Sequence, residues 1–175
     1  MSDSCPFLVK LSLNCHNTRA PTNIRARRLR VSALILSVAL SFTVVASASA
    51  GMLNQAEKYT GLHESKNNKS LKNILGANPR STPWCGLFLH AVASKAGRQS
   101  PKSYGFAKSW TSFGYAVPVN QAKPGDVVVI RNGRGYHAGI LKSMSGKTAQ
   151  ILGGNQSGRV QVSNFNRKAI VSVRR

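Results

Sequence analysis

The sequence changes character at Lys123, and this change limits the fold more than any other feature. Before it, apolar residues recur at helical spacing in short segments that end at glycine, around 51–61, 71–76 and 82–97. After it come β-branched apolar runs separated by short turns: VVVI, YHAGILK, TAQILGG, VQVSN and AIVSVRR. Helices first and strands second are typical of an α+β domain. We therefore predict N-terminal helices packed on a C-terminal antiparallel sheet, with the strands in a meander.

The segment TPWCGLFLHAVASKAG carries the clearest helix signals. We predict Thr82 as its N-cap, Pro83 at its first helical position and Gly97 as its C-terminal stop. This places Cys85 in the first turn. Unpaired backbone N–H groups and the helix dipole favour a thiolate there, so the pKa of Cys85 should fall below the free value of about 8.5.

A basic and then apolar stretch lies near the start of the chain. IRARRLR at 24–30 is followed by an uncharged apolar run that closes on Ala-Ser-Ala at 48–50. This order predicts a signal peptide with an N-terminal extension over 1–50, cut before Gly51, and one domain over 51–175. The apolar run is almost long enough to span a bilayer, so an uncleaved membrane anchor is the alternative. In both cases we expect export to the periplasm or the medium, free or held at the inner membrane.

Cysteine usage points to chemistry. Cys5 and Cys15 lie in the predicted leader, so the exported part holds Cys85 alone and forms no internal disulfide. A solitary thiol in an oxidising compartment is prone to oxidation, which favours a chemical role. The alternative is a buried cysteine that acts as a small apolar residue.

A cysteine nucleophile needs a histidine as its base, and His137 is the best candidate. His63 lies in a polar segment, and His90 is displaced by more than a turn from Cys85 on the same helix. Strand alternation sends His137 and Gly139 to one sheet face, where the glycine permits close approach of the helix. We therefore expect the imidazole to point toward Cys85.

A cysteine nucleophile with a histidine base also needs a group that orients the histidine and a donor that binds the oxyanion. An acceptor must orient the imidazole, as in Cys-His-Asn arrangements, and Asn155 is the first candidate with Gln156 as the second. For the oxyanion we favour the backbone N–H of Cys85 over the side chain of Gln55. We interpret Asp126 as a structural turn acceptor.

Four motifs occur in the order of a known group of enzymes: P-W-C-G-L-F at 83–88, K-P-G-D-V-V at 123–128, Y-H-A-G-I at 136–140 and L-G-G-N-Q at 152–156. The chain resembles the papain-like cell-wall hydrolases of the NlpC and CHAP groups, found in bacterial envelope enzymes and phage lysins.

The resemblance implies a papain-like fold and a cysteine that attacks a peptidoglycan amide to form an acyl-enzyme. It implies Cys85 as nucleophile and His137 as base. The third member varies in these groups, so Asn155 is a weaker transfer, and Trp84 is a weak candidate for substrate contact.

The charge indicates the partners. The chain has a formal net charge of +21, and residues 51–175 hold 19 basic and 3 acidic side chains, a net of +16. Peptidoglycan and anionic envelope polymers are the expected partners. No recognition-helix pattern or H-E-x-x-H spacing is present, so we expect no nucleic-acid partner, no metal and no cofactor. Membrane contact is expected only through an uncleaved leader. The alternative function is a non-catalytic cationic envelope-binding module of the same fold.

Overall fold

The structure is a computed structural model that describes residues 48–175, which lie within one compact unit. The α-helices are α1 Ala48–Glu57, α2 Asn68–Leu75 and α3 Cys85–Lys95, and the strands are β1 Val127–Asn132, β2 Gly135–Ser145, β3 Thr148–Gln156, β4 Arg159–Asn166 and β5 Ile170–Arg174. Short 3-10 helices cover Ala107–Ser112, Val119–Gln121 and Arg167–Ala169. The predicted leader falls outside these residues except for 48–50, which begin α1. Within 48–175 no helix is long and apolar enough to cross a membrane.

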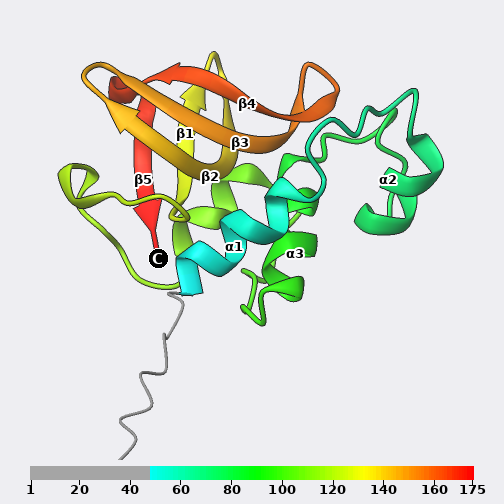
Figure 1. The fold of residues 1–175 in the computed structure, drawn as a ribbon, viewed down its shortest axis with the longest axis horizontal. Helices are drawn as coiled ribbons and strands as arrows, with labels where there is room; N and C mark the ends of the chain where they lie inside the picture. The colour runs from blue at the N-terminus through cyan, green and yellow to red at the C-terminus, as the bar shows by residue number, and fades with distance from the viewer. Residues whose placement is uncertain (1–47) are drawn as a thin grey trace, which may run out of the picture. The chain divides into compact units, whose positions relative to one another are not determined.

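The five strands form one antiparallel sheet in the order β4-β3-β2-β1-β5 (Figure 1). β1 to β4 follow one another as the predicted meander. β5 departs from it, because the chain returns from β4 to pair with β1 at the opposite edge. The predicted α+β arrangement, with helices first and an antiparallel sheet second, is confirmed.

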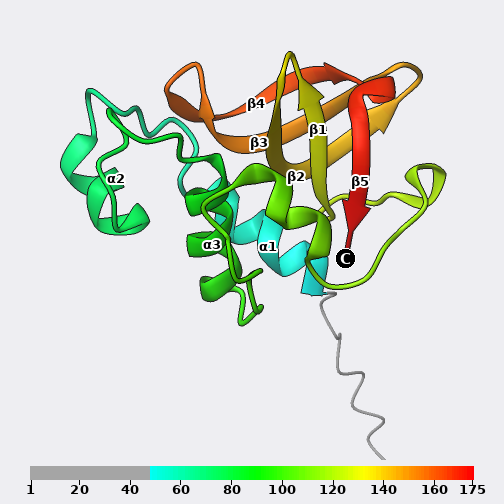
Figure 2. The same ribbon diagram turned by 180° about the vertical axis from the view of Figure 1, so that it is seen from behind.

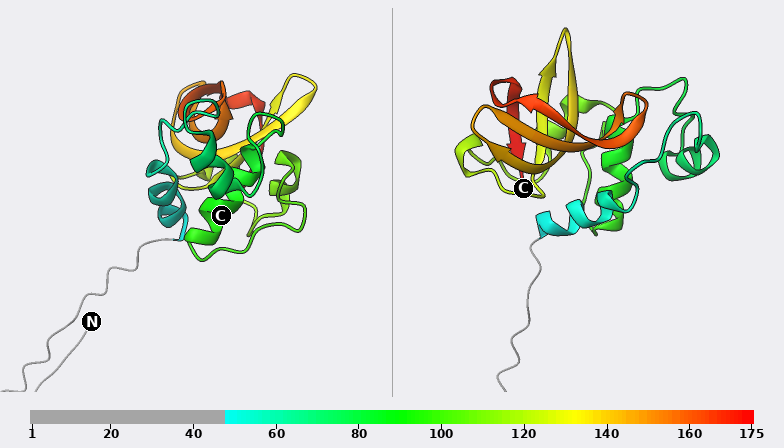
Figure 3. Two further views of the ribbon diagram at one scale, coloured as in Figure 1. Left: turned by 90° about the vertical axis from the view of Figure 1, so that its right-hand side faces the viewer. Right: turned by 45° about the horizontal axis from the view of Figure 1, so that its top comes forward.

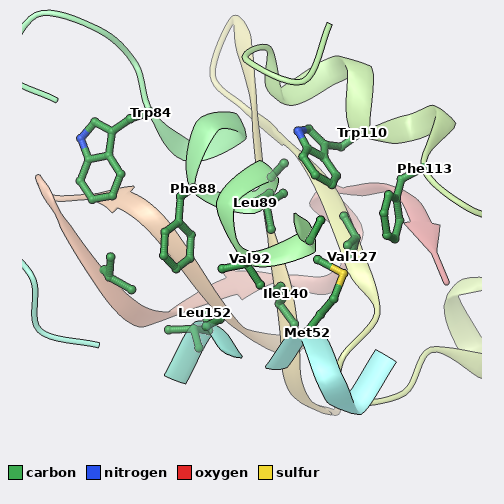
Figure 4. Close-up of a cluster of buried hydrophobic side chains, with 14 of the residues drawn as sticks. Met52, Trp84, Phe88, Leu89, Val92, Trp110, Phe113, Val127, Ile140 and Leu152 are labelled. Atoms are coloured by element: carbon green, nitrogen blue, oxygen red, sulfur yellow. The ribbon is translucent and has the colours of Figure 1, made fainter. Parts of the chain in front are cut away.

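The helices lie on one side of this sheet (Figures 1 and 3). α1 and α3 pack against the sheet, and α2 stands beyond α3, away from the strands, in views from both sides (Figure 2). Between helices and sheet lies the larger of two apolar cores, here called the helix-side core. Figure 4 shows Met52 of α1 and Phe88, Leu89 and Val92 of α3 gathered over the strands in this core.

The opposite face of the sheet is also apolar. Val128 and Ile130 of β1, Leu141 of β2 and Ile151 of β3 form a second cluster, here called the far-side core. Val129 and Ala138, which are paired across β1 and β2, belong to the helix-side core instead. Because successive strand residues point to opposite faces, these two cores tell which way each β2 side chain points.

The start of α3 differs from the sequence prediction. The helix begins at Cys85, and the preceding Trp84 makes no side-chain capping bond, so Thr82 and Pro83 lie outside the helix. The indole of Trp84 is fully buried and its Nε1 donates to Glu64 Oε2 at 3.2 Å. Burial of this large ring fixes the entry of the chain in place of a polar cap. The predicted stop is confirmed, since Gly97 has the left-handed φ of 67° after the helix ends.

Candidate active site

Cys85 is the first residue of α3 and its side chain is only 7% exposed. Burial raises the pKa of the Cys85 thiol above its ordinary value. Backbone N–H groups of Ala138, Gly86 and Cys85 itself act against this rise, because each can donate to the sulfur. The thiol therefore lies against β2, at the residue that follows His137, and it is protonated at neutral pH in this state.

The opening at Cys85, here called the thiol hollow, is formed by the start of α3, the segment 105–108 and one residue of β2. Its lining residues are Pro83, Cys85, Gly105, Phe106, Ala107, Lys108 and Tyr136. Gly86 allows the segment to close over the helix, since a Cβ there would lie 2.7 Å from the carbonyl oxygen of Gly105. The hollow thus brings the thiol of Cys85 together with one cationic side chain, that of Lys108.

His137 lies on β2 opposite Ile130 of the far-side core. Its ring stacks on Phe165 of β4, with centroids 5.8 Å apart and planes at 24°. The side chain is 7% exposed, Nε2 has no hydrogen-bond partner, and burial lowers the pKa of His137 to about 4. The imidazole is therefore neutral at physiological pH.

The direction predicted for His137 needs correction. His137 and Gly139 do share a face, but it is the face away from α3. Space for a Gly139 side chain is taken by Ile151 of the far-side core, whose Cγ2 would lie 2.5 Å from a Cβ there. The glycine that meets the helix is Gly154, where a Cβ would lie 2.6 Å from the Cβ of Phe88.

Cys85 and His137 consequently reach β2 from different sides. They line different hollows, and among residues 48–175 no hydrogen bond joins their side chains. The sulfur nevertheless meets the N–H of Ala138, which belongs to the peptide unit that begins at His137.

The opening at His137, here called the imidazole hollow, contains both candidates for the orienting group. Its lining residues are Asn132, His137, Asn155, Gln156, Ser157, Ser163 and Phe165. A register shift between β3 and β4 at 153–156 gives Asn155 the left-handed φ of 59°. This bulge turns the Asn155 side chain into the hollow and Gln156 beneath it.

Gln156 is the better placed of the two. It is 6% exposed, and its amide nitrogen donates to carbonyl groups of β3 and β4 that the bulge leaves available. Its Oε1 is buried without a partner, as is His137 Nε2. A Cβ on Gly153 would lie 3.0 Å from His137 Nε2 and 3.1 Å from Gln156 Nε2, so both side chains converge over this glycine.

Three other sequence candidates lie away from both hollows. Trp84 exposes none of its surface, so it is a core residue and offers no surface to a substrate. Gln55 Oε1 accepts from Lys58 Nζ on α1. Asp126 is fully buried, where it accepts from the Lys123 N–H at 2.8 Å and pairs with Arg175 at 2.8 Å through both carboxylate oxygens. The interpretation of Asp126 as structural is confirmed.

The two other histidines of residues 48–175 also have local partners. His63 Nδ1 accepts from the N–H of Ser65 at 3.0 Å, and the His90 ring stacks on Tyr104 with centroids 3.8 Å apart.

Sequence reasoning missed the residues that surround the two reactive groups. Phe165 and Lys108 come from segments with no motif of their own. Tyr136 had a readable signal, because strand alternation places it on the same face as Ala138, toward α3.

No protein-family model matches the sequence, and no curated protein matches it either. Among solved structures, the chain is similar to the P60 domain of an antigen from M. avium subspecies paratuberculosis, with 17% identity and a TM-score of 0.50, over 73% of this chain and 93% of that one. It is also similar to a hypothetical invasion protein of Mycobacterium tuberculosis, with 15% identity and a TM-score of 0.49, over 73% of this chain and 61% of that one. The part of the chain that the structure describes thus shares its fold with a P60 domain.

Proposed function

We propose that this chain is a cysteine hydrolase that cuts amide bonds in peptidoglycan, with Cys85 as nucleophile and His137 as its base. The observation that carries the proposal is the Cys85 sulfur at the first residue of a helix, against the N–H of the residue after His137. The P60-domain likeness supports the same class, because the four sequence motifs resemble the NlpC group to which P60 domains belong. A papain-like variant of the α+β fold is part of this proposal.

The reaction begins with transfer of the thiol proton to the imidazole. For this the His137 ring leaves Phe165 and turns toward the sulfur, which becomes a thiolate stabilised by the N–H groups at the start of α3. The thiolate attacks the amide carbon, and the backbone N–H of Cys85 binds the oxyanion. The C–N bond breaks as the imidazolium protonates the leaving amine. Water then attacks the thioester, and Cys85 is regenerated.

The orienting acceptor belongs to the imidazole hollow. Asn155 and Gln156 both line this hollow, and Gln156 Oε1 is buried without a partner, so we propose that one of the two accepts from the imidazole once it has turned toward the sulfur. An acceptor on one ring nitrogen fixes the tautomer that leaves the other nitrogen free to take the thiol proton.

The predicted leader and the net positive charge support a location outside the cytoplasm. We propose export to the periplasm or the medium, free or held at the inner membrane. The basic surface of 51–175 would hold the enzyme on anionic envelope polymers and peptidoglycan.

One observation favours a second function, a non-catalytic envelope-binding module of this fold. The thiol and the imidazole are both neutral in the structure and line different hollows. A module of this kind would keep Cys85 and His137 as packing residues.

Digestion of purified sacculi separates the two functions. We expect the wild type to release muropeptides, Cys85→Ala to release none, and His137→Gln to lose at least about 100-fold, as general-base removal usually costs. His63→Gln is the matched control, because it removes an imidazole that lines neither hollow. Mass spectrometry of the fragments would identify the bond. Equal sacculus binding by wild type and Cys85→Ala, with no fragments from either, would establish the binding module instead.

A further inference from the structure

We propose that the thiol hollow binds a carboxylate of the substrate, held by Lys108 and Arg131, which both lie over the ring of Tyr136. The inference rests on the proposed function in taking Cys85 as the reacting atom. It adds the chemical class that the site selects: an acyl or amine portion that carries a free carboxylate close to the scissile amide.

Both cations lie over one aromatic ring. Lys108 Nζ is 5.6 Å and the guanidinium carbon of Arg131 is 5.0 Å from the centroid of Tyr136. Arg131 Nη1 also donates to the Tyr136 hydroxyl at 2.9 Å, which ties the guanidinium to a residue that lines the thiol hollow. Tyr136 and Lys108 both line that hollow together with Cys85. Lys108 therefore lines the same hollow as Cys85, and Arg131 is joined to that hollow through Tyr136.

These charges have no acidic partner within residues 48–175. The three carboxylates described there are bound elsewhere: Glu57 to Lys142 at 3.1 Å, Glu64 to the Trp84 indole, and Asp126 to Arg175. Because a guanidinium carries five N–H donors, Arg131 keeps donors free after its bond to Tyr136. Its planar fork matches a carboxylate, and Lys108 adds a second positive charge.

The thiol hollow also adjoins a mostly apolar depression. An adjoining depression is lined by Thr82, Pro83, Leu87, Gly105 and Phe106, three of which also line the thiol hollow. The Phe106 side chain is 74% exposed, which is unusual for so large an apolar group. A substrate that lies across Cys85 therefore places aliphatic atoms near Phe106 and its anionic group near Lys108.

Two alkylating reagents test the carboxylate preference without any turnover. Iodoacetate and iodoacetamide transfer similar groups to the same sulfur and differ in carrying a carboxylate or an amide. Their rate ratio at one pH cancels the ionisation of Cys85 and reports the local charge. We expect Lys108→Met and Arg131→Met each to lower the iodoacetate-to-iodoacetamide ratio roughly 3- to 10-fold, the effect of removing one charge at this range.

Lys147→Met is the matched control, since Lys147 is an exposed lysine in the turn after β2. It should leave both the ratio and the iodoacetamide rate unchanged. Ratios that are equal in wild type, Lys108→Met and Arg131→Met would overturn the proposal.

The same variants separate this inference from the proposed function. With stem peptides as substrates, we expect Lys108→Met to raise KM for the free carboxylate and not for the matching carboxamide. If the iodoacetate-to-iodoacetamide ratio falls as expected but the protein cuts no sacculi, the anion site is supported and the proposed hydrolase function is rejected. If the protein cuts sacculi and Lys108→Met changes KM equally for the carboxylate and carboxamide peptides, the hydrolase function is supported and the anion site is rejected.

Discussion

The surroundings of His137 differ strongly from those of a free side chain. Its ring is buried against Phe165 and lacks a partner at Nε2. Burial therefore keeps the imidazole neutral well below its usual titration range. A proton on this ring is costly in the observed position, so protonation and departure from Phe165 should occur together.

This cost makes stability depend on pH. The pKa of His137 is about 4 in the folded chain, against about 6.5 in an unfolded one, so the unfolded state binds more protons between these values. We expect the free energy of unfolding to be highest above pH 6.5, where His137 is neutral in both states. It should decrease toward pH 4 by up to roughly 3 kcal/mol.

Urea denaturation of wild type and His137→Phe over this range is the measurement. The phenylalanine keeps the stacking on Phe165 and cannot titrate, so its curve should be flatter. Parallel curves would show that the imidazole is not held neutral by the fold.

At the scale of elements, the contact of α3 with β3 positions the nucleophile. Gly154 on β3 brings the strand backbone directly against Phe88 and Trp84 at the helix start. Cys85 lies between these two residues in sequence, so its sulfur is carried to β2 by the same contact. The close approach needs a residue without a Cβ.

Gly154→Ala should therefore damage both stability and the site. The added Cβ would lie 2.6 Å from the Cβ of Phe88 and 2.7 Å from Cζ3 of Trp84. Overpacking of this kind typically costs about 1–3 kcal/mol, and the start of α3 must shift to relieve it. Thermal unfolding and the Cys85 alkylation rate should both change.

Gly135→Ala is the control, because a Cβ there meets only the carbonyl oxygen of Asn132 at 3.8 Å. Equal stability of the two variants would contradict the packing that we describe.

At the scale of the whole molecule, sequence periodicity predicted the secondary-structure elements. It did not predict how these elements pack against one another. The helix stop at Gly97, the strand segments and the position of Cys85 at a helix start were readable, because each follows from neighbours in sequence. Strand alternation also correctly placed His137 and Gly139 on one face. Which face receives α3 could not be read, because both faces of β2 are apolar and buried.

The return of β5 to β1 was unreadable for a similar reason. Arg175, just after β5, reaches the buried Asp126 just before β1, and this pairing spans 49 residues. No local pattern encodes such a partner. The bulge that separates the roles of Asn155 and Gln156 likewise depends on the register of β3 against β4.

The central claim is that His137 ionises Cys85, although the two lie on different sides of β2 in the structure. The most direct test is the pH profile of Cys85 alkylation by iodoacetamide in wild type and His137→Phe. If the side chains pair, the wild type reacts at pH values below the titration of a free thiol, about 8.5, and His137→Phe loses this reaction. If both proteins react only in one common rise above that value, as the buried thiol alone would, the two residues do not form a catalytic pair.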